Sequence, residues 1–253
     1  LVGFVDMLVD DELFATAPNL RLVQLLSAGY DRADIDSARK ASVPISNNGG
    51  ANSVAVSEHA LMLMLATSRQ LVRQHTNVAS GRWRGNDTPK LTELRGKTVG
   101  IVGLGTIGKK TARLALAFGM NVIYYDVARL TEGEEDALGV RFRLLRELLR
   151  QSDILSLHVP LNDTTRHMIG AEQFSEMTSS AILINTSRGP VVDEVALTDA
   201  LTSGEITAAG LDVLDQEPPP ADNPLFGLDN VILTPHMAGP TFESNEARVR
   251  NAF

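Results

Sequence analysis

Short, almost continuously apolar runs alternate with segments of helical periodicity through most of the chain after residue 97. Parallel strands that are buried on both faces have such continuous apolar runs, and a period of 3.6 residues indicates helices between them. The alternation predicts an α/β fold with a doubly wound parallel sheet and right-handed crossovers. The expected strands are 98–102, 121–125, 153–159, 181–185, 206–213 and 231–233, and the expected helices are 107–118, 144–150, 172–177 and 194–203.

The first part of the chain has shorter elements. We expect strands at 1–5, 21–27 and 43–46, a helix at 31–41, a break at 47–50 and a long helix over 53–79 that Gly81 ends. This organisation predicts a smaller domain over 1–50, to which 241–253 returns, and a larger domain over 51–240. Because the chain begins inside a strand pattern and ends inside a helical one, we expect the smaller domain to be truncated.

Composition narrows the classes of function. The 253 residues carry 31 acidic and 23 basic side chains, for a net charge of −8, and have no basic cluster, which argues against nucleic acid or an anionic membrane as partner. No apolar run is long enough to span a membrane. The absence of cysteine removes disulfides and thiol ligands and fits the cytoplasm, where we expect the protein. No His, Asp and Glu set has ligand spacing, so we expect no metal site.

A glycine-rich turn predicts a dinucleotide site. Gly103, Gly105 and Gly108 directly follow an expected strand and open an expected helix. Such glycines allow a tight turn, a close approach of the pyrophosphate to the backbone, and close packing of helix on strand. Asp126 ends the next strand, where a carboxylate accepts a ribose hydroxyl and repels a 2′-phosphate. The pattern predicts NAD as cofactor rather than NADP, although the nearby Arg129 leaves some use of NADP open.

Three polar residues with complementary chemistry follow later strands. Arg188 can grip a carboxylate with two hydrogen bonds, and His236 can exchange a proton near neutral pH. Glu217 would orient the imidazole and favour its protonated form. Each residue alone is more often structural, but the carboxyl ends of parallel strands share one edge, where the nicotinamide must also lie. Their joint placement therefore favours a site that reduces a carbonyl group.

Longer motifs extend this pattern over nearly the whole chain. They resemble the D-isomer-specific 2-hydroxyacid dehydrogenase family, in which the spaced Arg, Glu-Pro and Pro-His set is characteristic. The motifs are Ser-Ala-Gly-Tyr-Asp at 27–31, Asn-Ser at 52–53, Ser-Glu-His-Ala at 57–60, Leu-Arg-Gly-Lys-Thr-Val-Gly at 94–100, Leu-His-Val-Pro-Leu at 157–161, Asn-Thr-Ser-Arg-Gly at 185–189, Gly-Leu-Asp-Val at 210–213, Glu-Pro at 217–218 and Thr-Pro-His-Met-Ala-Gly at 234–239.

The resemblance implies a Rossmann NAD-binding domain and a smaller flavodoxin-like substrate domain. It assigns the catalytic roles to Arg188, Glu217 and His236, with backbone N–H groups around Ala28 and Gly29 helping to bind the substrate carboxylate. It also implies a homodimer formed through residues 53–80. The implied cofactor contacts beyond the glycines are Thr106, Ile107, Asp126, Val159, Pro160, Thr165, Thr186, Ser187 and Asp212.

The main functional hypothesis is therefore an oxidoreductase that transfers a hydride between NAD(H) and a pair of D-2-hydroxy acid and 2-keto acid. Arg188 would anchor the substrate, and His236 with Glu217 would act as acid and base. Two alternatives remain open from the sequence. A non-catalytic NAD-binding interaction protein of the C-terminal-binding corepressor type can retain the same residues, and a phosphite oxidoreductase also resembles the pattern.

Overall fold

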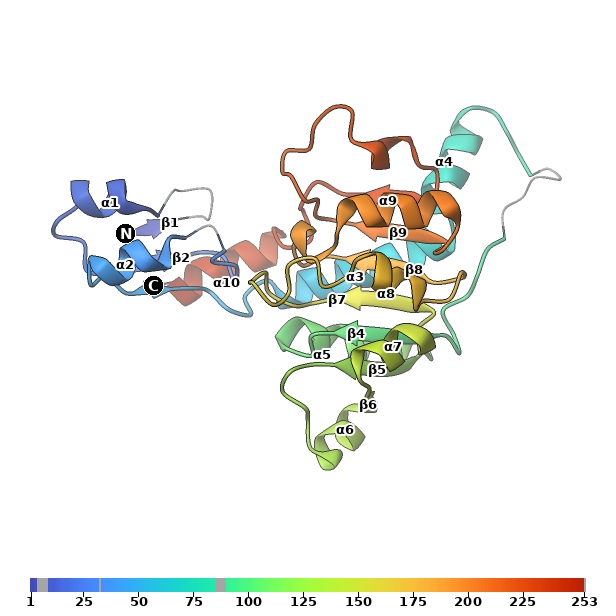
Figure 1. Cartoon of the computed structure of the whole chain (residues 1–253), viewed down its shortest axis with the longest axis horizontal. Helices are drawn as coiled ribbons and strands as arrows, with labels where there is room; N and C mark the ends of the chain where they lie inside the picture. Colours follow the sequence, from blue (N-terminus) through green and yellow to red (C-terminus); the bar gives the residue numbers. More distant parts are fainter. Residues whose placement is uncertain (4–8, 32, 85–89, 253) are drawn as a thin grey trace. The chain divides into compact units, whose positions relative to one another are not determined.

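The computed structural model of the chain describes residues 1–3, 9–31, 33–84 and 90–252 (Figure 1). These residues divide into two compact units, one formed by Leu1–Ala55 and Gly239–Phe253 and the other by Val56–Ala238. The boundaries expected from the sequence, after residues 50 and 240, fall within five residues of these divisions. Each unit has its own parallel sheet.

The larger unit is built on a parallel sheet with strand order β10-β9-β8-β7-β4-β5-β6, which has seven strands within the described residues. The chain runs outward from β4 to β6 and then returns to build β7 to β10 on the other side, so the sheet is doubly wound as predicted. The strands are β4 (Thr98–Val102), β5 (Asn121–Tyr125), β6 (Val140–Phe142), β7 (Ile154–Leu157), β8 (Ile182–Asn185), β9 (Ala208–Leu211) and β10 (Val231–Leu233).

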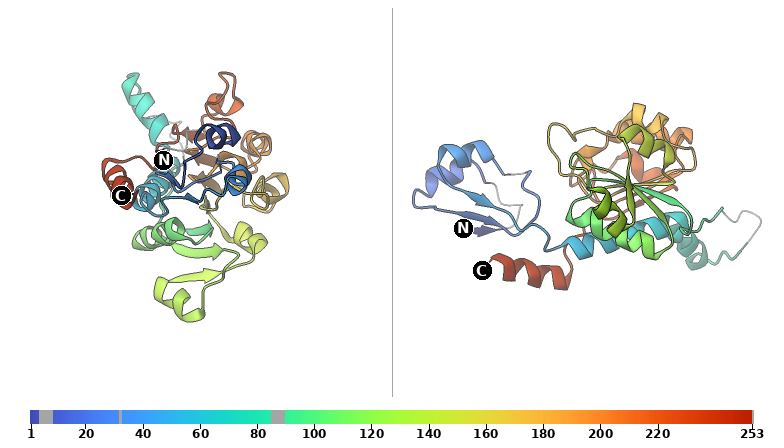
Figure 2. Two further views of the ribbon diagram at one scale, coloured as in Figure 1. Left: turned by 90° about the vertical axis from the view of Figure 1, so that its left-hand side faces the viewer. Right: turned by 90° about the horizontal axis from the view of Figure 1, so that it is seen from below.

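Helices cover both faces of this sheet and bury its apolar strands (Figures 1 and 2). One face packs on α7 (Leu145–Gln151), α8 (Ala171–Ser175) and α9 (Glu194–Ser203), and the other packs on α3 (Ser53–Ser68) and α5 (Thr106–Ala117). Strand residues alternate between the two cores: Ile101 packs on the α3 and α5 side, whereas Val102 packs on the opposite side. This two-sided burial explains the continuous apolar runs in the sequence.

The long helix predicted over 53–79 is wrong as a single element. The chain forms α3 and then α4 (Leu71–Ala79), separated by Gln70 in a left-handed conformation with a φ of 46°. The carbonyl of Ser68 accepts a hydrogen bond from the Thr92 amide instead of a helical partner. The break involves neither glycine nor proline, so the composition did not reveal it. Gly81 follows the end of α4 with a φ of 80°, as expected of a glycine that terminates a helix.

Helix α6 (Glu132–Leu138) and the short strand β6 were not predicted. The helix is mostly polar, so it lacks the apolar stripe on which helix prediction depends. Its start does carry a signal, because Thr131 and Glu134 form a reciprocal capping box. Strand β6 has only three residues and lies at the edge of the sheet.

The smaller unit has a parallel sheet with strand order β1-β2-β3 in the described residues. Its strands β2 (Val23–Leu25) and β3 (Ile45–Ser46) and helix α2 (Ile35–Lys40) lie inside the predicted segments. Strand β1 comprises Val2–Gly3, and the remaining residues of the strand predicted at 1–5 lie outside the described residues. Helices α1 (Asp11–Thr16) and α10 (Phe242–Ala252) complete the unit. None of the helices in the described part of the chain has the length and apolar character that a membrane crossing demands.

Candidate active site

Neighbouring strands of the larger sheet end at the same level. The pairing register joins the last residue of each strand to the last residue of the next: Tyr125 with Val102, Val102 with Leu157, Leu157 with Asn185, Asn185 with Leu211, and Leu211 with Leu233. Adjacent strands lie about 4.8 Å apart, so the segments that follow them emerge side by side along one edge. The glycine loop and the segments carrying Asp126, Thr186, Asp212 and His236 all begin there.

The glycine loop follows β4, at the point where the strand order reverses between β4 and β7. Gly103 has a φ of 92°, and a Cβ there would lie 2.7 Å from the carbonyl oxygen of His158. A Cβ on Gly108 would overlap the carbonyl oxygen of Gly103. A Cβ on Gly105 would meet no protein atom within 4 Å. The first and third glycines are therefore required by the fold, whereas Gly105 faces open space.

The start of helix α5 fits a phosphate group. Gly105 is its N-cap and supplies no side-chain hydrogen bond, and the first turn, which contains Thr106, Ile107 and Gly108, has no acidic residue. The first N–H groups of a helix have no partner within the helix and carry the positive end of its dipole. The open approach at Gly105 gives an anionic ligand access to these donors, so the residues present fit the pyrophosphate of a dinucleotide.

Asp126 ties the glycine loop to the turn after β5. Its Oδ2 accepts a hydrogen bond from the Leu104 amide at 2.6 Å, and its Oδ1 accepts one from the Ala128 amide at 2.9 Å. A carboxylate has about four acceptor positions, so these two bonds leave capacity for a ribose hydroxyl. The carboxylate thus lies next to the glycine loop, as a dinucleotide site requires.

The segment after β7 lies against the glycine loop. A Cβ on Gly103 would also lie 2.9 Å from Val159. Thr165 donates its hydroxyl to the Pro160 carbonyl at 2.6 Å, which closes the segment on itself. His158 pairs through Nε2 with the Ser156 hydroxyl at 2.9 Å, and its Nδ1 is buried. Burial lowers the pKa of His158 to about 4, so this ring is neutral near pH 7 and is not suited to donate a proton.

His236 and Glu217 form a direct pair. The Nδ1 of His236 lies 2.7 Å from Oε2 of Glu217, and the imidazole side chain is 44% exposed. Glu217 is positioned in turn by the Leu214 amide, which donates to its Oε1 at 3.2 Å. Because Nδ1 is engaged by the carboxylate, Nε2 is the ring nitrogen that can exchange a proton with a ligand. His236 has a φ of 54°, a backbone conformation that non-glycine residues rarely adopt and that is common in functional sites.

Asp212 anchors the segment that carries His236. Its carboxylate is buried and accepts hydrogen bonds from the Thr234 hydroxyl at 2.6 Å and from the Met237 and Ala238 amides at 2.9 and 2.8 Å. The backbone carbonyl of Asp212 also accepts the His236 amide at 2.8 Å. Asp212 therefore fixes residues on both sides of the imidazole, a positioning task that the sequence did not reveal.

His59 is a further member of this network that sequence reasoning missed. Its Nε2 lies 2.9 Å from the Thr234 hydroxyl and 3.5 Å from Oδ1 of Asp212. Since the Thr234 hydroxyl donates to Asp212, it accepts from His59, which requires a proton on Nε2. The sequence carries two signals for His59, its polar character on the largely apolar helix α3 and its place in the Ser-Glu-His-Ala motif at 57–60, but neither indicates its partners.

Arg188 follows β8 in a segment held by its neighbours. Asn185 donates from Nδ2 to the Arg188 carbonyl at 2.9 Å, and Nη1 of Arg188 donates to the Ser187 carbonyl at 2.7 Å. The next residue, Gly189, passes so close to the backbone of Leu214 that a Cβ would overlap its carbonyl group. Gly189 thus lies against Leu214, and the Leu214 amide donates to Glu217. The backbone next to Arg188 is therefore in contact with the backbone that positions the pair of Glu217 and His236.

Two predicted substrate-binding residues lie in the other unit. Ala28 and Gly29 form the turn after β2, where Asn47 donates from Nδ2 to the Ala28 carbonyl at 2.7 Å and the Ser27 hydroxyl donates to the Gly29 carbonyl at 2.8 Å. Within the described residues, no group of three or more His, Asp or Glu side chains could hold a metal ion.

Comparison with known proteins identifies the family. Residues 61–238 match the model for the D-isomer specific 2-hydroxyacid dehydrogenase, NAD binding domain. A glyoxylate reductase of Korarchaeum cryptofilum is 43% identical over 247 residues, which cover 96% of this chain and 74% of that protein. The crystal structure of D-lactate dehydrogenase from Aquifex aeolicus complexed with NAD and lactic acid superposes with a TM-score of 0.90 at 33% identity, covering 99% of this chain and 80% of that one.

A further solved structure extends the comparison to another coenzyme. An acyclic imino acid reductase, Bsp5, in complex with NADPH and D-Arg has a TM-score of 0.89 at 31% identity, over 99% of this chain and 78% of that one. The chain spans about three quarters of the length of these relatives. The relatives are reductases and dehydrogenases, which supports the enzyme hypothesis and not the corepressor-type alternative. The chain belongs to the D-isomer specific 2-hydroxyacid dehydrogenases, NAD-linked oxidoreductases that interconvert 2-hydroxy and 2-keto acids.

Proposed function

We propose that this chain reduces a small 2-keto acid, with glyoxylate as the first candidate, and that the pair of His236 and Glu217 exchanges the proton. The 2.7 Å contact between Nδ1 of His236 and Glu217 carries the proposal, because it occurs at the same edge of the sheet as the glycine loop. The similarity to a glyoxylate reductase supports the choice of substrate. The same residues would serve the reverse reaction on a D-2-hydroxy acid.

Each of the three residues has a separate task in this proposal. Arg188 would bind the substrate carboxylate through two charge-assisted hydrogen bonds, with the amides around Ala28 and Gly29 as further donors. His236 would donate a proton from Nε2 to the carbonyl oxygen, while Glu217 keeps the ring oriented and stabilises its charged form. Bound NADH would supply the hydride that reaches C2 of the substrate.

The coenzyme would lie along the edge of the sheet. The glycine loop and the start of α5 would hold its pyrophosphate, and Asp126 would accept the adenosine ribose hydroxyls and repel a 2′-phosphate, which favours NAD over NADP. The segments after β7, β8 and β9 would line the rest of its path. The residues proposed to contact it are Gly103, Gly105, Thr106, Ile107, Gly108, Asp126, Val159, Pro160, Thr165, Thr186, Ser187 and Asp212.

A panel of 2-keto acids tests this proposal. We expect the wild-type protein to oxidise NADH in the presence of glyoxylate or a close analogue, and the loss of NADH absorbance measures this reaction. The His236→Ala and Arg188→Ala variants should lose turnover by about 10²- to 10⁴-fold while NADH binding survives. The exposed His75 provides a matched control, and His75→Ala should keep full activity. Unchanged absorbance across the panel with the wild-type protein would contradict the proposal and favour a non-catalytic NAD-binding role.

We also propose that a second copy of this chain covers an apolar hollow on α3. The hollow is lined by Leu61, Met62 and Leu65 of α3, Leu71 of α4 and Leu114 of α5. Met62 is 45% exposed there, and a contiguous apolar surface of this kind is typical of subunit interfaces. Light scattering should give the mass of a dimer for the wild-type protein and of a monomer for Met62→Lys, whereas a monomeric wild-type protein would refute the interface.

A cytoplasmic location remains part of the proposal. It is consistent with a sequence that contains no cysteine. Fractionation of cells that express the protein would test it, and recovery in the membrane fraction would contradict it.

A further inference from the structure

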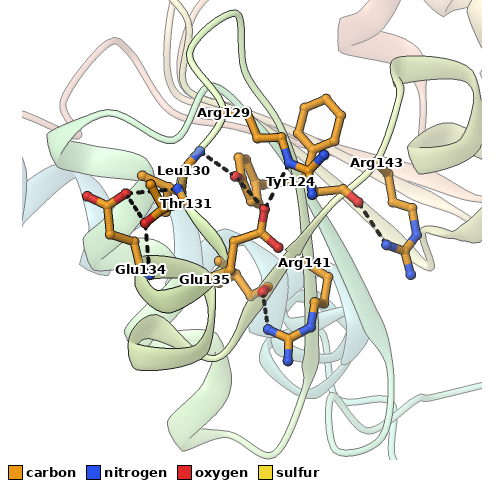
Figure 3. A network of polar contacts seen from close by, with 10 residues as sticks. Tyr124, Arg129, Leu130, Thr131, Glu134, Glu135, Arg141 and Arg143 are labelled. Atoms are coloured by element: carbon orange, nitrogen blue, oxygen red, sulfur yellow. Dashed lines mark hydrogen bonds and ion pairs between the residues drawn. The ribbon is translucent and has the colours of Figure 1, made fainter.

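Arg129 lies three residues after Asp126, in the turn that leads away from β5. Its guanidinium is the kind of group that binds a phosphate, since it offers several donors and a fixed positive charge. In this structure the guanidinium has protein partners instead. Nε of Arg129 lies 3.4 Å from Oε1 of Glu135, and Cζ lies 5.0 Å from the centre of the Phe142 ring. Figure 3 shows Arg129 directed toward Glu135.

Glu135 is itself held firmly. It is 4% exposed, and its Oε1 accepts a hydrogen bond from the Tyr124 hydroxyl at 3.0 Å (Figure 3). Tyr124 is fully buried, and its hydroxyl accepts the Leu130 amide at 2.9 Å, which fixes the backbone next to Arg129. Burial raises the pKa of Tyr124, so its hydroxyl stays protonated and remains a donor to Glu135. The carboxylate therefore stays in place beneath the guanidinium.

Phe142 provides the second partner from β6. Its ring packs edge-on against Tyr124, with ring centroids 5.6 Å apart and an interplanar angle of 74°. The face of the ring attracts the guanidinium through a cation–π interaction. The Arg129 side chain remains 58% exposed, so these two contacts restrain the guanidinium without burying it.

We propose that Glu135 and Phe142 withhold Arg129 from a coenzyme 2′-phosphate, so that Glu135 is a positioning residue for NAD specificity. The proposal rests on the proposed function, in which the ribose of NAD lies at Asp126. In this proposal Asp126 repels the 2′-phosphate directly. Glu135 adds to the discrimination because it pairs with Arg129, the first basic residue after Asp126 in the chain. A guanidinium released from Glu135 would attract the phosphate that distinguishes NADP from NAD.

Glu135→Gln tests the restraint. Glutamine keeps an oxygen that can accept from Tyr124 but removes the charge that attracts Arg129. We expect the affinity for NADPH, measured by titration of coenzyme fluorescence, to rise about fivefold, and the affinity for NADH to change by less than about twofold. Glu134→Gln is the matched control, because Glu134 is exposed on the same helix and glutamine preserves its capping box with Thr131. It should change neither affinity.

Arg129→Ala identifies the source of the gain. In the Glu135→Gln background it should abolish the gain in NADPH affinity, since the released guanidinium supplies it. A gain that persists without Arg129, or unchanged NADPH binding in Glu135→Gln, would overturn the proposal. Should Glu135→Gln fail to unfold cooperatively, Phe142→Leu weakens the same restraint and should give a smaller gain that also depends on Arg129.

Failure of the proposed function has a different signature in the same titrations. A wild-type protein that binds neither NADH nor NADPH would refute the coenzyme site itself, and with it this inference. A wild-type protein that binds NADH while Glu135→Gln leaves the ratio of the two affinities unchanged would refute only the role of Glu135.

Discussion

One added methyl group in the glycine loop, at Gly105, should weaken coenzyme binding while leaving the stability of the fold almost unchanged. Gly105 has a φ of −71° and an extended backbone, and a Cβ there meets no protein atom within 4 Å. Gly105→Ala should therefore be nearly neutral for stability, because two effects of similar size oppose each other. Alanine stabilises by about 0.4–1 kcal/mol through the lower conformational entropy of the unfolded chain, but it is a poorer N-cap than glycine, at a cost of about 0.5–1.5 kcal/mol. The expected change in the free energy of unfolding is below about 1 kcal/mol.

The same methyl group should damage coenzyme binding. In the proposed site the methyl group would lie where the pyrophosphate approaches the amides at the start of α5, and losing one hydrogen bond to a charged group costs about 1.5–3 kcal/mol. The dissociation constant for NADH should rise about 10- to 100-fold. Urea unfolding and a fluorescence titration with NADH measure the two effects on the same sample.

Gly108→Ala is the contrasting variant. Its Cβ would overlap the carbonyl oxygen of Gly103, so we expect a loss of stability of about 1–3 kcal/mol or more. Equal destabilisation by Gly105→Ala and Gly108→Ala, or normal NADH binding by Gly105→Ala, would refute the assignment of separate tasks to these glycines.

Three further perturbations test other parts of the account. Gly189→Ala places a Cβ into the backbone of Leu214, so urea unfolding should show a loss of stability of about 1–3 kcal/mol or more, and most of the turnover should also be lost. Wild-type stability of this variant would contradict the close approach of the two backbones. Because burial lowers the pKa of His158 to about 4, the unfolded chain binds a proton first as the pH falls below 6.5, so the free energy of unfolding should decrease between pH 6.5 and 4 by up to about 3 kcal/mol. His158→Asn should remove that part of the pH dependence, and an unchanged slope would refute the burial. Tyr124→Phe leaves the Leu130 amide without its acceptor and should cost about 1–3 kcal/mol; a smaller loss in thermal unfolding would show that water replaces the hydroxyl.

The sequence was sufficient for the elements whose burial leaves a local pattern. The strand predicted at 98–102 agrees with β4, and the helix predicted at 194–203 agrees with α9. Such strands are apolar throughout because both faces of the sheet are covered. The sequence did not predict helix α6, because most of its residues are polar. It did not predict the break at Gln70, because no glycine or proline marks it. The break at Gln70 leaves no local period, and the local signal of α6 is confined to its capping box at Thr131 and Glu134.

The sequence predicted the pair of His236 and Glu217 at the candidate site, but not the hydrogen bonds that hold the surrounding segments in place. The pairing of His236 with Glu217 followed from strand exits that share one edge, and the structure brings the two residues into contact. The links from His59 to Thr234 and Asp212 join residues far apart in the chain, and only the folded sheet brings them together. Whether Ala28 and Gly29 take part in binding the substrate stays a prediction.

The most direct test of the account is a crystal structure of the protein with NADH and oxamate, an analogue of a 2-keto acid. We predict that the pyrophosphate lies at the start of α5, that the oxamate carboxylate is hydrogen-bonded to the Arg188 guanidinium, and that its amide carbonyl oxygen accepts from Nε2 of His236. Oxamate bound away from His236, or coenzyme bound at a different edge of the sheet, would contradict the central claim that these side chains form one reductive site.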